Sequence, residues 1–312
     1  MIQKEIIEFV SSKTGIKNKG LIEKDIILHR LLLELTNACE FADNYVFKGG
    51  TCLTKCHFGY YRFSEDLDFT CIDQKKFEGK SEMQIRRIIS AELNSLGKII
   101  KTICDNIGLD FKNDKKDSNY FKYGGGNKFI TMKLWYESEE SKSKDFIKVE
   151  INFVDKILYP IKRYNAENLI GIKDKPQMAF LLSENSEWLI KIPSIQSYDI
   201  REILTEKVRA ILTRKGVKGR DFLDVFVISK NSRLEPRDFK KEIIQKTKLM
   251  IDKYRKYANN IKNKNFQFLD KFVLGEEEKL LITKISEGLS EFLKDFKEFL
   301  EELLKELNSV QK

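Results

Sequence analysis

Two aspartates separated by one residue mark the segment best suited to chemistry. Asp66 and Asp68 begin the run DLDFTCI over residues 66–72, whose alternating character predicts a strand. The two-residue period of a strand places both carboxylates on one face. Carboxylates this close repel each other unless a cation lies between them, and Mg²⁺ favours such oxygen ligands together with substrate phosphates. The alternative is that both side chains are merely solvated at the start of an edge strand.

A glycine turn precedes this pair. Residues 45–47 predict a short strand, the sequence KGGT follows over residues 48–51, and a short helix is expected over 52–58. Glycines at such a place allow backbone N–H groups to approach a phosphate. The spacing is not that of a P-loop, so the pattern indicates either a phosphate-binding turn of another kind or a plain turn.

A third carboxylate lies in another expected strand. Glu150 stands in the largely apolar run over residues 146–154, where alternation places it on one face with Lys148 and Asn152. On a strand next to that of the two aspartates, it would complete a metal site. The alternative is that this face is the solvent side of an edge strand.

The second half of the chain holds a lysine and an aspartate among apolar residues. Lys207 lies on the apolar stripe of the helix expected over residues 198–214, and Asp224 is surrounded by large apolar residues in RDFLDVFVI. A charge in such surroundings is paired or functional, although a lysine can also extend to water. The two side chains could be partners, or both could face the metal site.

These candidates require two kinds of element to position them. The expected elements are helices over residues 1–45 and 75–107, a loop or hairpin over 114–126, and strands over 128–136, 146–154 and 188–192. After Tyr198 only helical patterns follow, and the clearest runs from Leu281 to Leu307. We therefore expect an α+β domain over residues 1–194 and an all-helical domain over residues 195–312.

Composition limits the class of protein. The chain has 312 residues and a net charge of +9, which permits a polyanionic partner. It has no apolar run of membrane-spanning length and no secretory signal, so we expect a cytoplasmic protein without a membrane partner. Five scattered cysteines do not form a disulfide framework. Cys52, Cys56 and His57 lack the second ligand pair of a structural zinc site.

Two long motifs resemble those of a known family. G-G-T-x-L-x-K with R-F-S-E-D-L-D-F lies within residues 49–69, and EILTEKVRAILTR with GRDFLDVF lies within residues 202–226. Together they look like the AbiEii/AbiGii-type nucleotidyltransferases, which are toxins of type IV toxin–antitoxin systems. The resemblance spans about residues 45–230.

The resemblance implies an α+β fold of the polymerase-β-like nucleotidyltransferase type, with a small mixed sheet and helices followed by a helical domain. It also implies an NTP as substrate and Mg²⁺ as cofactor. It implies that the catalytic residues are Asp66, Asp68, Lys207 and Asp224. It also implies that Asp66 and Asp68 ligate the metal ion. Glu150 is the expected third ligand, matched to the family only by its position in a strand. The residues implied in nucleotide binding are Lys48, Gly49, Gly50, Thr51, Arg62 and Ser64.

The resulting hypothesis is a Mg²⁺-dependent transfer of a nucleoside monophosphate from an NTP to RNA such as tRNA. The resemblance also implies a cognate antitoxin, which could act by modifying Ser64. The alternatives are nucleotidyl transfer to a protein or small molecule, a non-catalytic nucleic-acid-binding protein on the same scaffold, and a nuclease that uses the same acids. The sequence leaves the NTP, the acceptor and the oligomeric state open.

Overall fold

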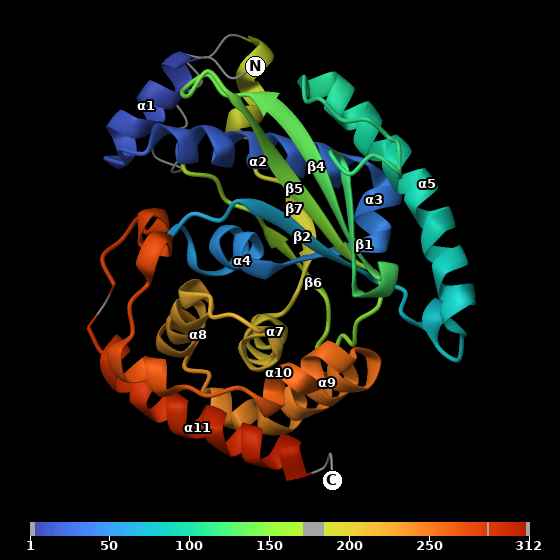
Figure 1. Ribbon diagram of the computed structural model, residues 1–312. Coiled ribbons are helices and arrows are strands. Elements are labelled where there is room, and N and C mark those ends of the chain that lie inside the picture. Colours follow the sequence, from blue (N-terminus) through green and yellow to red (C-terminus); the bar gives the residue numbers. More distant parts are fainter. Residues whose placement is uncertain (1–3, 171–183, 286, 310–312) are drawn as a thin grey trace. The chain divides into compact units, whose positions relative to one another are not determined.

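The structure is a computed structural model that describes residues 4–170, 184–285 and 287–309 (Figure 1). The chain divides into two compact units. Unit 1 comprises Met1–Asp155 and Ile161–Tyr198, and unit 2 comprises Lys156–Pro160 and Asp199–Lys312. Unit 1 therefore ends four residues after the expected boundary at 194, and a five-residue segment from its middle belongs with unit 2.

Unit 1 is built on a mixed sheet of seven strands in the order β3-β4-β5-β2-β1-β7-β6. The strands are β1 (Tyr45–Lys48), β2 (Asp66–Cys71), β3 (Phe121–Gly124), β4 (Phe129–Glu137), β5 (Lys144–Asn152), β6 (Lys162–Asn165) and β7 (Ser194–Ser197). β2 pairs with β5 in parallel and with β1 in antiparallel orientation. The expected small mixed sheet is confirmed, and β2 lies at its centre.

One face of this sheet is apolar and the other is polar along the central strands. Leu67 and Phe69 of β2, and Val149 and Ile151 of β5, are fully buried. The residues between them are polar and half-buried. The helices of unit 1 are α1 (Lys4–Thr14), α2 (Lys19–Asn37), α3 (Cys39–Asn44), α4 (Gly49–Cys52) and α5 (Glu82–Ile107). α2 runs across the sheet and packs against β2 and α5 (Figure 1).

α5 shows why a local sequence gives a helix with defined ends. Ser81 caps its first turn and forms a capping box with Gln84. Its buried stripe repeats at three- and four-residue spacing, and the helix ends at Gly108, which adopts a left-handed conformation. The expectation of a helix from residue 75 was too long, because Lys75–Phe77 forms a separate 3₁₀ turn.

Two strands near the end of unit 1 differ from expectation. The strand expected over residues 188–192 is wrong, because Glu184–Ile190 forms a 3₁₀ helix. The strands lie instead at β6 and β7, which are four residues each. β6 has the sequence KRYN and lies at the sheet edge, so it lacks the apolar alternation by which a strand is recognised.

Unit 2 is built of helices, as expected. They are α7 (Ile200–Thr213), α8 (Gly219–Ser232), α9 (Lys240–Lys253), α10 (Arg255–Lys262) and α11 (Leu289–Ser309), with short 3₁₀ turns between them. α11 buries Leu293, Phe296, Phe299, Leu300 and Leu303. The apolar stripe expected from Leu281 begins only at Leu289, because the preceding residues do not continue the helix.

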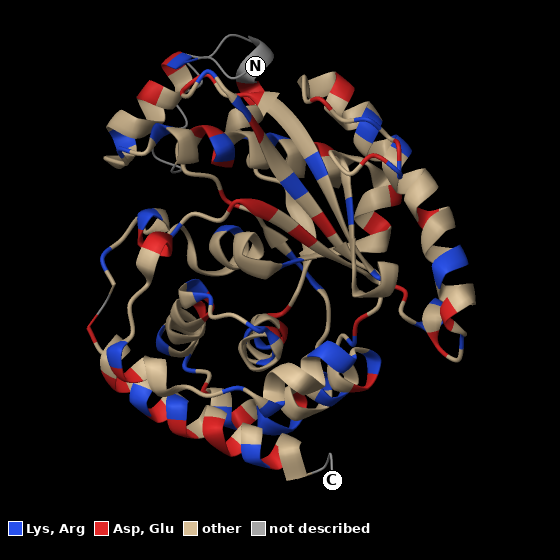
Figure 2. Cartoon of the chain, in the orientation of Figure 1, with Lys and Arg blue, Asp and Glu red and all other residues tan. Residues whose placement is uncertain are grey.

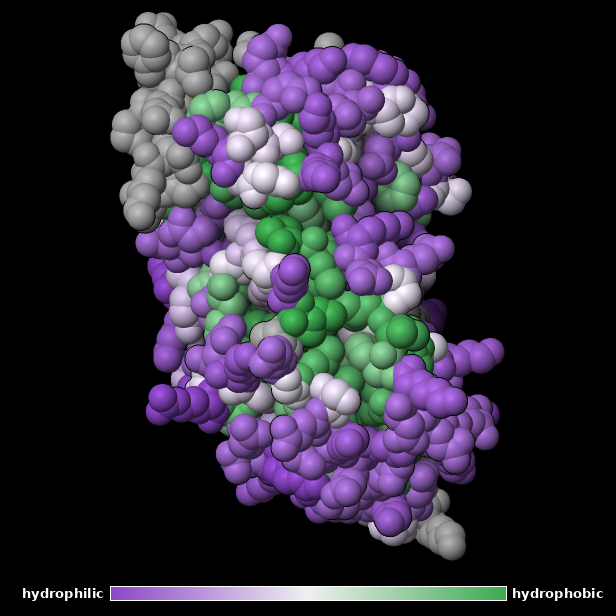
Figure 3. All heavy atoms as spheres, turned by 90° about the vertical axis from the view of Figure 1, so that its left-hand side faces the viewer, coloured by the Kyte–Doolittle hydropathy of each residue, from purple (hydrophilic) through white to green (hydrophobic). Residues whose placement is uncertain are grey.

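The surface reflects the high content of charged residues. Hydrophilic side chains cover most of the face drawn in Figure 3, and apolar residues are exposed in its middle. Among the described residues, no helix is both long enough and apolar enough to cross a membrane. All five cysteines are free thiols.

Candidate active site

The register of β2 and β5 brings three predicted carboxylates onto neighbouring strands. Asp66 lies opposite Lys148, and Asp68 lies opposite Glu150. Because alternate residues of a strand point to one face, these four side chains share the polar face of the sheet. Glu150 therefore lies on the strand next to that of the two aspartates, as predicted for the backbone.

A lysine compensates part of this negative charge. Lys148 Nζ lies 3.0 Å from Asp66 Oδ1, and the two side chains are 36% and 20% exposed. Burial lowers the pKa of Lys148, but the Asp66 carboxylate beside it outweighs burial and raises that pKa above its ordinary value. Sequence reasoning placed Lys148 on this face and gave it no role. Its alternation with Glu150 was the available signal.

The third carboxylate has a polar neighbour of its own. Thr131 of β4 donates a hydrogen bond to Glu150 at 3.1 Å. Within the ranges that the structure describes, no three His, Cys, Asp or Glu side chains come together closely enough to hold a metal ion. The oxygen donors on this face are nevertheless of the kind that Mg²⁺ prefers, and such an ion commonly takes its remaining ligands from phosphates. Glu150 as a metal ligand stays a prediction.

The glycine turn lies directly against these carboxylates. Gly49 follows β1 with a φ of 76°, and a Cβ at this position would lie 2.1 Å from Asp68 Oδ2. Both the backbone conformation and the close approach therefore require glycine here. A Cβ at Gly50 would lie 2.7 Å from Arg62 Nη2 and 3.0 Å from Ser64 Oγ.

The third residue of the turn joins the two parts of the first motif. The Thr51 hydroxyl donates to the backbone carbonyl of Asp66 at 2.5 Å and lies 2.8 Å from the Ser64 hydroxyl. Arg62 is 2% exposed and donates to the Phe63 carbonyl at 2.7 Å. The predicted residues from Gly49 to Thr51, with Arg62, Ser64, Asp66 and Asp68, therefore form one compact group.

The turn is anchored to α2 by a buried ion pair. Lys55, the last residue of G-G-T-x-L-x-K, lies 2.9 Å from Asp25, and both side chains are buried. The Tyr60 hydroxyl donates to Asp25 at 2.9 Å, and burial raises the pKa of this phenol. Sequence reasoning missed this anchor, because Asp25 stands in a helix far from the motif and nothing in its neighbours marks it.

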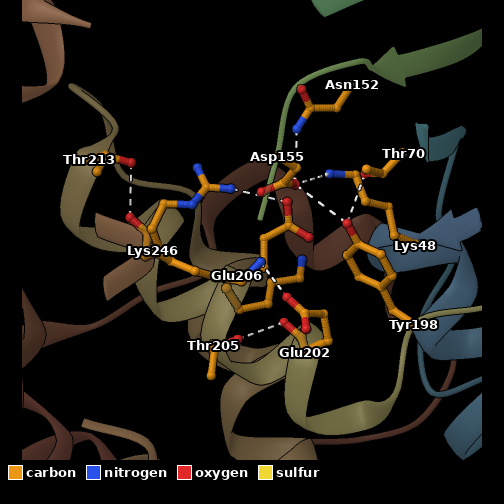
Figure 4. Close-up of polar contacts among 12 residues, drawn as sticks. Lys48, Thr70, Asn152, Asp155, Tyr198, Glu202, Thr205, Glu206, Thr213 and Lys246 are labelled. Atoms are coloured by element: carbon orange, nitrogen blue, oxygen red, sulfur yellow. Dashed lines mark hydrogen bonds and ion pairs between the residues drawn. The ribbon is translucent and has the colours of Figure 1, made fainter. Parts of the chain in front are cut away.

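Lys48 occupies a buried polar cluster at the end of β1 (Figure 4). Its Nζ lies 3.4 Å from Asp155 Oδ2, and Asn152 donates to the same carboxylate at 3.0 Å. The Tyr198 hydroxyl lies 2.9 Å from Thr70 Oγ1 and 3.4 Å from Asp155. Lys48 was predicted to bind the nucleotide, and it is 6% exposed. No local pattern marks Asp155, because it follows the apolar strand in an irregular segment.

The predicted residues of unit 2 form a second cluster. Lys207 Nζ lies 2.9 Å from Asp221 Oδ1 and 2.6 Å from Asp224 Oδ2, and Arg214 also pairs with Asp221. The Asp221 and Asp224 side chains are 3% and 0% exposed, whereas that of Lys207 is 13% exposed. Of the two alternatives for Lys207 and Asp224, the structure shows that they are partners. Asp221 and Arg214 lie within the second motif but were not singled out.

A second buried ion pair of unit 2 contacts residues 156–160, the segment that interrupts unit 1 in the sequence. Glu202 of α7 accepts hydrogen bonds from the backbone N–H groups of Leu158 and Tyr159 at 2.7 and 2.8 Å. Its carboxylate also contacts Lys246 of α9, and both side chains are almost wholly buried. Burial raises the pKa of Glu202, although Lys246 opposes this shift.

Comparison with known proteins gives a family match over most of the chain. The family model described as "Nucleotidyl transferase AbiEii toxin, Type IV TA system" matches residues 30–306. The match includes the glycine turn, the β2 carboxylates and the Lys207 cluster. Comparison with curated proteins gives no significant match.

Solved structures resemble the chain over almost its whole length. The crystal structure of JHP933 from Helicobacter pylori is 19% identical and has a TM-score of 0.41, with 95% of this chain and 100% of that chain covered. MenT4, a nucleotidyltransferase toxin from Mycobacterium tuberculosis, is 15% identical with a TM-score of 0.37, with 96% and 98% covered. The assignment to a family rests on the family model.

Proposed function

The chain belongs to the AbiEii family of nucleotidyltransferase toxins of type IV toxin–antitoxin systems, and we propose that it moves a nucleoside monophosphate from an NTP to an RNA acceptor such as tRNA. The observation that carries the proposal is the packing of Gly49 against Asp68. It sets a backbone turn free of side chains beside two carboxylates, as a triphosphate with its metal ion requires.

In this proposal the turn binds the triphosphate. Backbone N–H groups of Gly49, Gly50 and Thr51 approach the phosphate oxygens, because no Cβ stands in the way at the two glycines. Arg62 and Ser64, which lie against Gly50, add a positive charge and a hydroxyl donor at the same place. Lys48, which directly precedes the turn, supports it through its ion pair with Asp155.

Asp66 and Asp68 are the proposed Mg²⁺ ligands, with Glu150 as a third. When bound, the ion would neutralise charge on the phosphates and orient them for in-line displacement at the α-phosphorus. Lys148 holds the Asp66 carboxylate in a fixed position through their ion pair at 3.0 Å. A carboxylate of this group can also accept the proton of the attacking hydroxyl of the acceptor.

Lys207 is the proposed contact of unit 2 with the triphosphate. Asp221 and Asp224 act on it as positioning residues, because they fix the ammonium group at 2.9 and 2.6 Å. A cation held in this way is ready to meet an anion without further ordering of its side chain. The role assigned to Asp224 is thus to orient Lys207.

The toxin–antitoxin assignment implies a cognate antitoxin. We propose Ser64 as the point where an antitoxin could silence the enzyme by modification, because its hydroxyl lies beside Gly50 and Thr51. A phosphate on this hydroxyl would place negative charge where the triphosphate is proposed to bind. Absence of any mass change at Ser64 after co-expression with the neighbouring gene product would contradict this part.

A labelling assay tests the function. The protein is incubated with Mg²⁺, each α-phosphate-labelled NTP in turn, and total RNA including tRNA. The wild type should label an RNA band with at least one NTP, and Asp66→Asn should not. The matched control is Asp43→Asn, which removes an exposed carboxylate from α3 of the same unit and should label like the wild type. Label in a protein or small molecule instead of RNA would overturn the proposed acceptor, and shortened RNA would indicate a nuclease.

A further inference from the structure

Positive charge is concentrated in two consecutive helices of unit 2. Residues 240–264, which contain α9 and α10, hold nine Lys or Arg and two Asp or Glu, a net charge of +7 in a chain that carries +9. α11 holds three lysines and six acids. Figure 2 shows blue along α9 and α10, and red and blue alternating along α11. The net charge is therefore a local feature and not a general property of a lysine-rich surface.

Apart from the buried Lys246, the cations of both helices lie on the side that faces away from the core. Lys241 and Lys248 are seven residues apart on α9, and Arg255 and Lys262 are seven apart on α10. Seven residues are about two helical turns, so each pair shares a face. The buried residues are Ile243, Ile244, Lys246, Thr247 and Met250 on α9, and Ile261 on α10.

Three cations of this segment differ from their neighbours, because no acidic partner contacts them within the described residues. Arg237, just before α9, and Lys240, its first residue, pair with Glu302 and Glu306 of α11 at 2.9 and 3.0 Å. In the described part of the chain, no carboxylate forms an ion pair with the exposed side chains of Lys241, Arg255 or Lys262. Like charges left unpaired on one surface repel each other, and this repulsion is relieved when a polyanion binds.

Aromatic side chains lie among these cations. The rings of Tyr254 and Tyr257 are 5.5 Å apart, both residues are half-exposed, and Lys256 Nζ lies 5.0 Å from the centre of the Tyr257 ring. Cations interleaved with aromatic rings suit nucleic acid, since bases stack on the rings while phosphates meet the cations. A membrane surface fits less well, because Ile243, Ile244 and Met250 of α9 are buried, and no apolar side chain of this helix is fully exposed to enter a bilayer.

We propose that Lys241, Lys248, Arg255, Lys256 and Lys262 form a surface that binds the phosphate backbone of the RNA acceptor. This inference rests on the proposed function, because it takes the acceptor to be RNA. Such contacts position an RNA without reading its sequence. The surface therefore accounts for affinity, and recognition of a particular RNA lies elsewhere.

Direct binding tests the surface. The triple variant Lys241→Gln/Arg255→Gln/Lys262→Gln is compared with the wild type for binding of total bacterial tRNA without NTP, over a series of salt concentrations. Loss of three phosphate contacts should weaken binding roughly a hundredfold at 0.1 M salt and reduce the slope of log K against log salt by about two. The matched control, Arg86→Gln/Arg87→Gln/Lys98→Gln, removes three exposed charges from α5 and should bind like the wild type.

Two results would overturn the surface. One is a triple variant that is folded and keeps both the affinity and the salt slope of the wild type. The other is an equal loss in the α5 control, which would indicate a general charge effect. The outcomes separate from those of the proposed function: tRNA binding through this surface without any nucleotide transfer contradicts only the function, whereas RNA labelling unaffected by the triple variant contradicts only the surface.

Discussion

The carboxylates of the two units differ in how their charge is compensated. In unit 2, Asp221 and Asp224 are almost wholly buried, and Lys207 and Arg214 contact them directly. In unit 1, the Asp66 side chain is 20% exposed and pairs with Lys148. Asp68 and Glu150 lie with it on the polar face of β2 and β5, the open face. The charge of a buried carboxylate must be compensated by groups of the protein, whereas carboxylates that solvent reaches can bind a cation from solution.

This difference predicts two different consequences when a carboxylate is removed. Removal of a carboxylate from the open face should relieve repulsion and leave the fold intact, while it removes a metal ligand. Removal of one side of the buried cluster should leave an uncompensated charge in the interior and destabilise unit 2. The variants below test this distinction, from the largest expected effect to the smallest.

Asp68→Asn should abolish transfer without loss of stability. The amide keeps the size of the side chain but removes the charge that a Mg²⁺ ligand requires, so we expect transfer to fall roughly a thousandfold. Urea denaturation should give an unfolding free energy within about 0.5 kcal/mol of that of the wild type, because the amide keeps the shape of a side chain that is only half-buried. A variant that transfers nucleotide normally, or that is strongly destabilised, would remove the distinction between the two groups of carboxylates.

Gly49→Ala should damage the same face from the side of the turn. The new Cβ would meet the Asp68 carboxylate, which must move away, and displacement of a reacting group by about 1 Å can cost roughly a hundredfold in rate. The control is Gly79→Ala. Gly79 also has a positive φ, of 67°, but no atom lies within 4 Å of its added Cβ. Both variants should lose about 1–3 kcal/mol of stability from backbone strain, and only Gly49→Ala should lose transfer. Equal activities would show that the contact with Asp68 is irrelevant.

These residues also show what the sequence could predict. The strand period placed Asp66 and Asp68 on one face, and the alternation of β5 placed Glu150 and Lys148 together, because those rules are local. The pairing of β2 with β5 joins residues about 82 positions apart in the chain, and no local rule gives it. Asp25 and Asp155 were missed for the same reason, since their partners Lys55 and Lys48 come from distant elements.

The prediction of secondary structure failed where the sequence pattern was weak. The strands β6 and β7 are only four residues long, which is too short for a clear alternation, so β6 was missed and a strand was expected over residues 188–192 instead of at β7. The long helices were found from their stripes, but their starts were placed too early at residue 75 and at Leu281. The capping box at Ser81 marks the true beginning of α5 and was the available signal.

Lys207→Met should mainly affect stability, in contrast to the open face. It removes the cation that contacts both buried carboxylates, Asp221 and Asp224, so we expect a loss of about 3–5 kcal/mol in the unfolding free energy measured with urea. The double variant Lys207→Met/Asp224→Asn should recover part of this loss, because it removes one of the stranded charges. At a temperature where the single variant is folded, the KM for NTP should still rise about tenfold if Lys207 meets the triphosphate.

The control for this prediction is Lys215→Met, which removes an exposed lysine between α7 and α8 and should change neither quantity. A stable Lys207→Met protein would show that the buried cluster does not depend on its lysine. A destabilised variant with an unchanged KM would confine the cluster to a structural role and remove Lys207 from the proposed binding of the triphosphate.

Glu202→Gln should give the smallest effect, a change in how stability depends on pH. Burial raises the pKa of Glu202 in the folded protein, so the folded state holds this proton to a higher pH than the unfolded chain. The stability that this proton contributes is complete below the unfolded pKa of about 4.3. It is lost as pH rises through the folded pKa, with a slope of at most about 1.4 kcal/mol per pH unit.

The unfolding free energy of the wild type, measured relative to Glu202→Gln, should therefore fall as pH rises above about 4.3, and the exposed Glu235→Gln in the same unit serves as the control. A difference that rises over this range would mean that the contact with Lys246 and the two backbone N–H groups outweighs burial. The buried carboxylates of unit 2 would then gain from ionisation, and the contrast with the open face of β2 would rest on exposure alone.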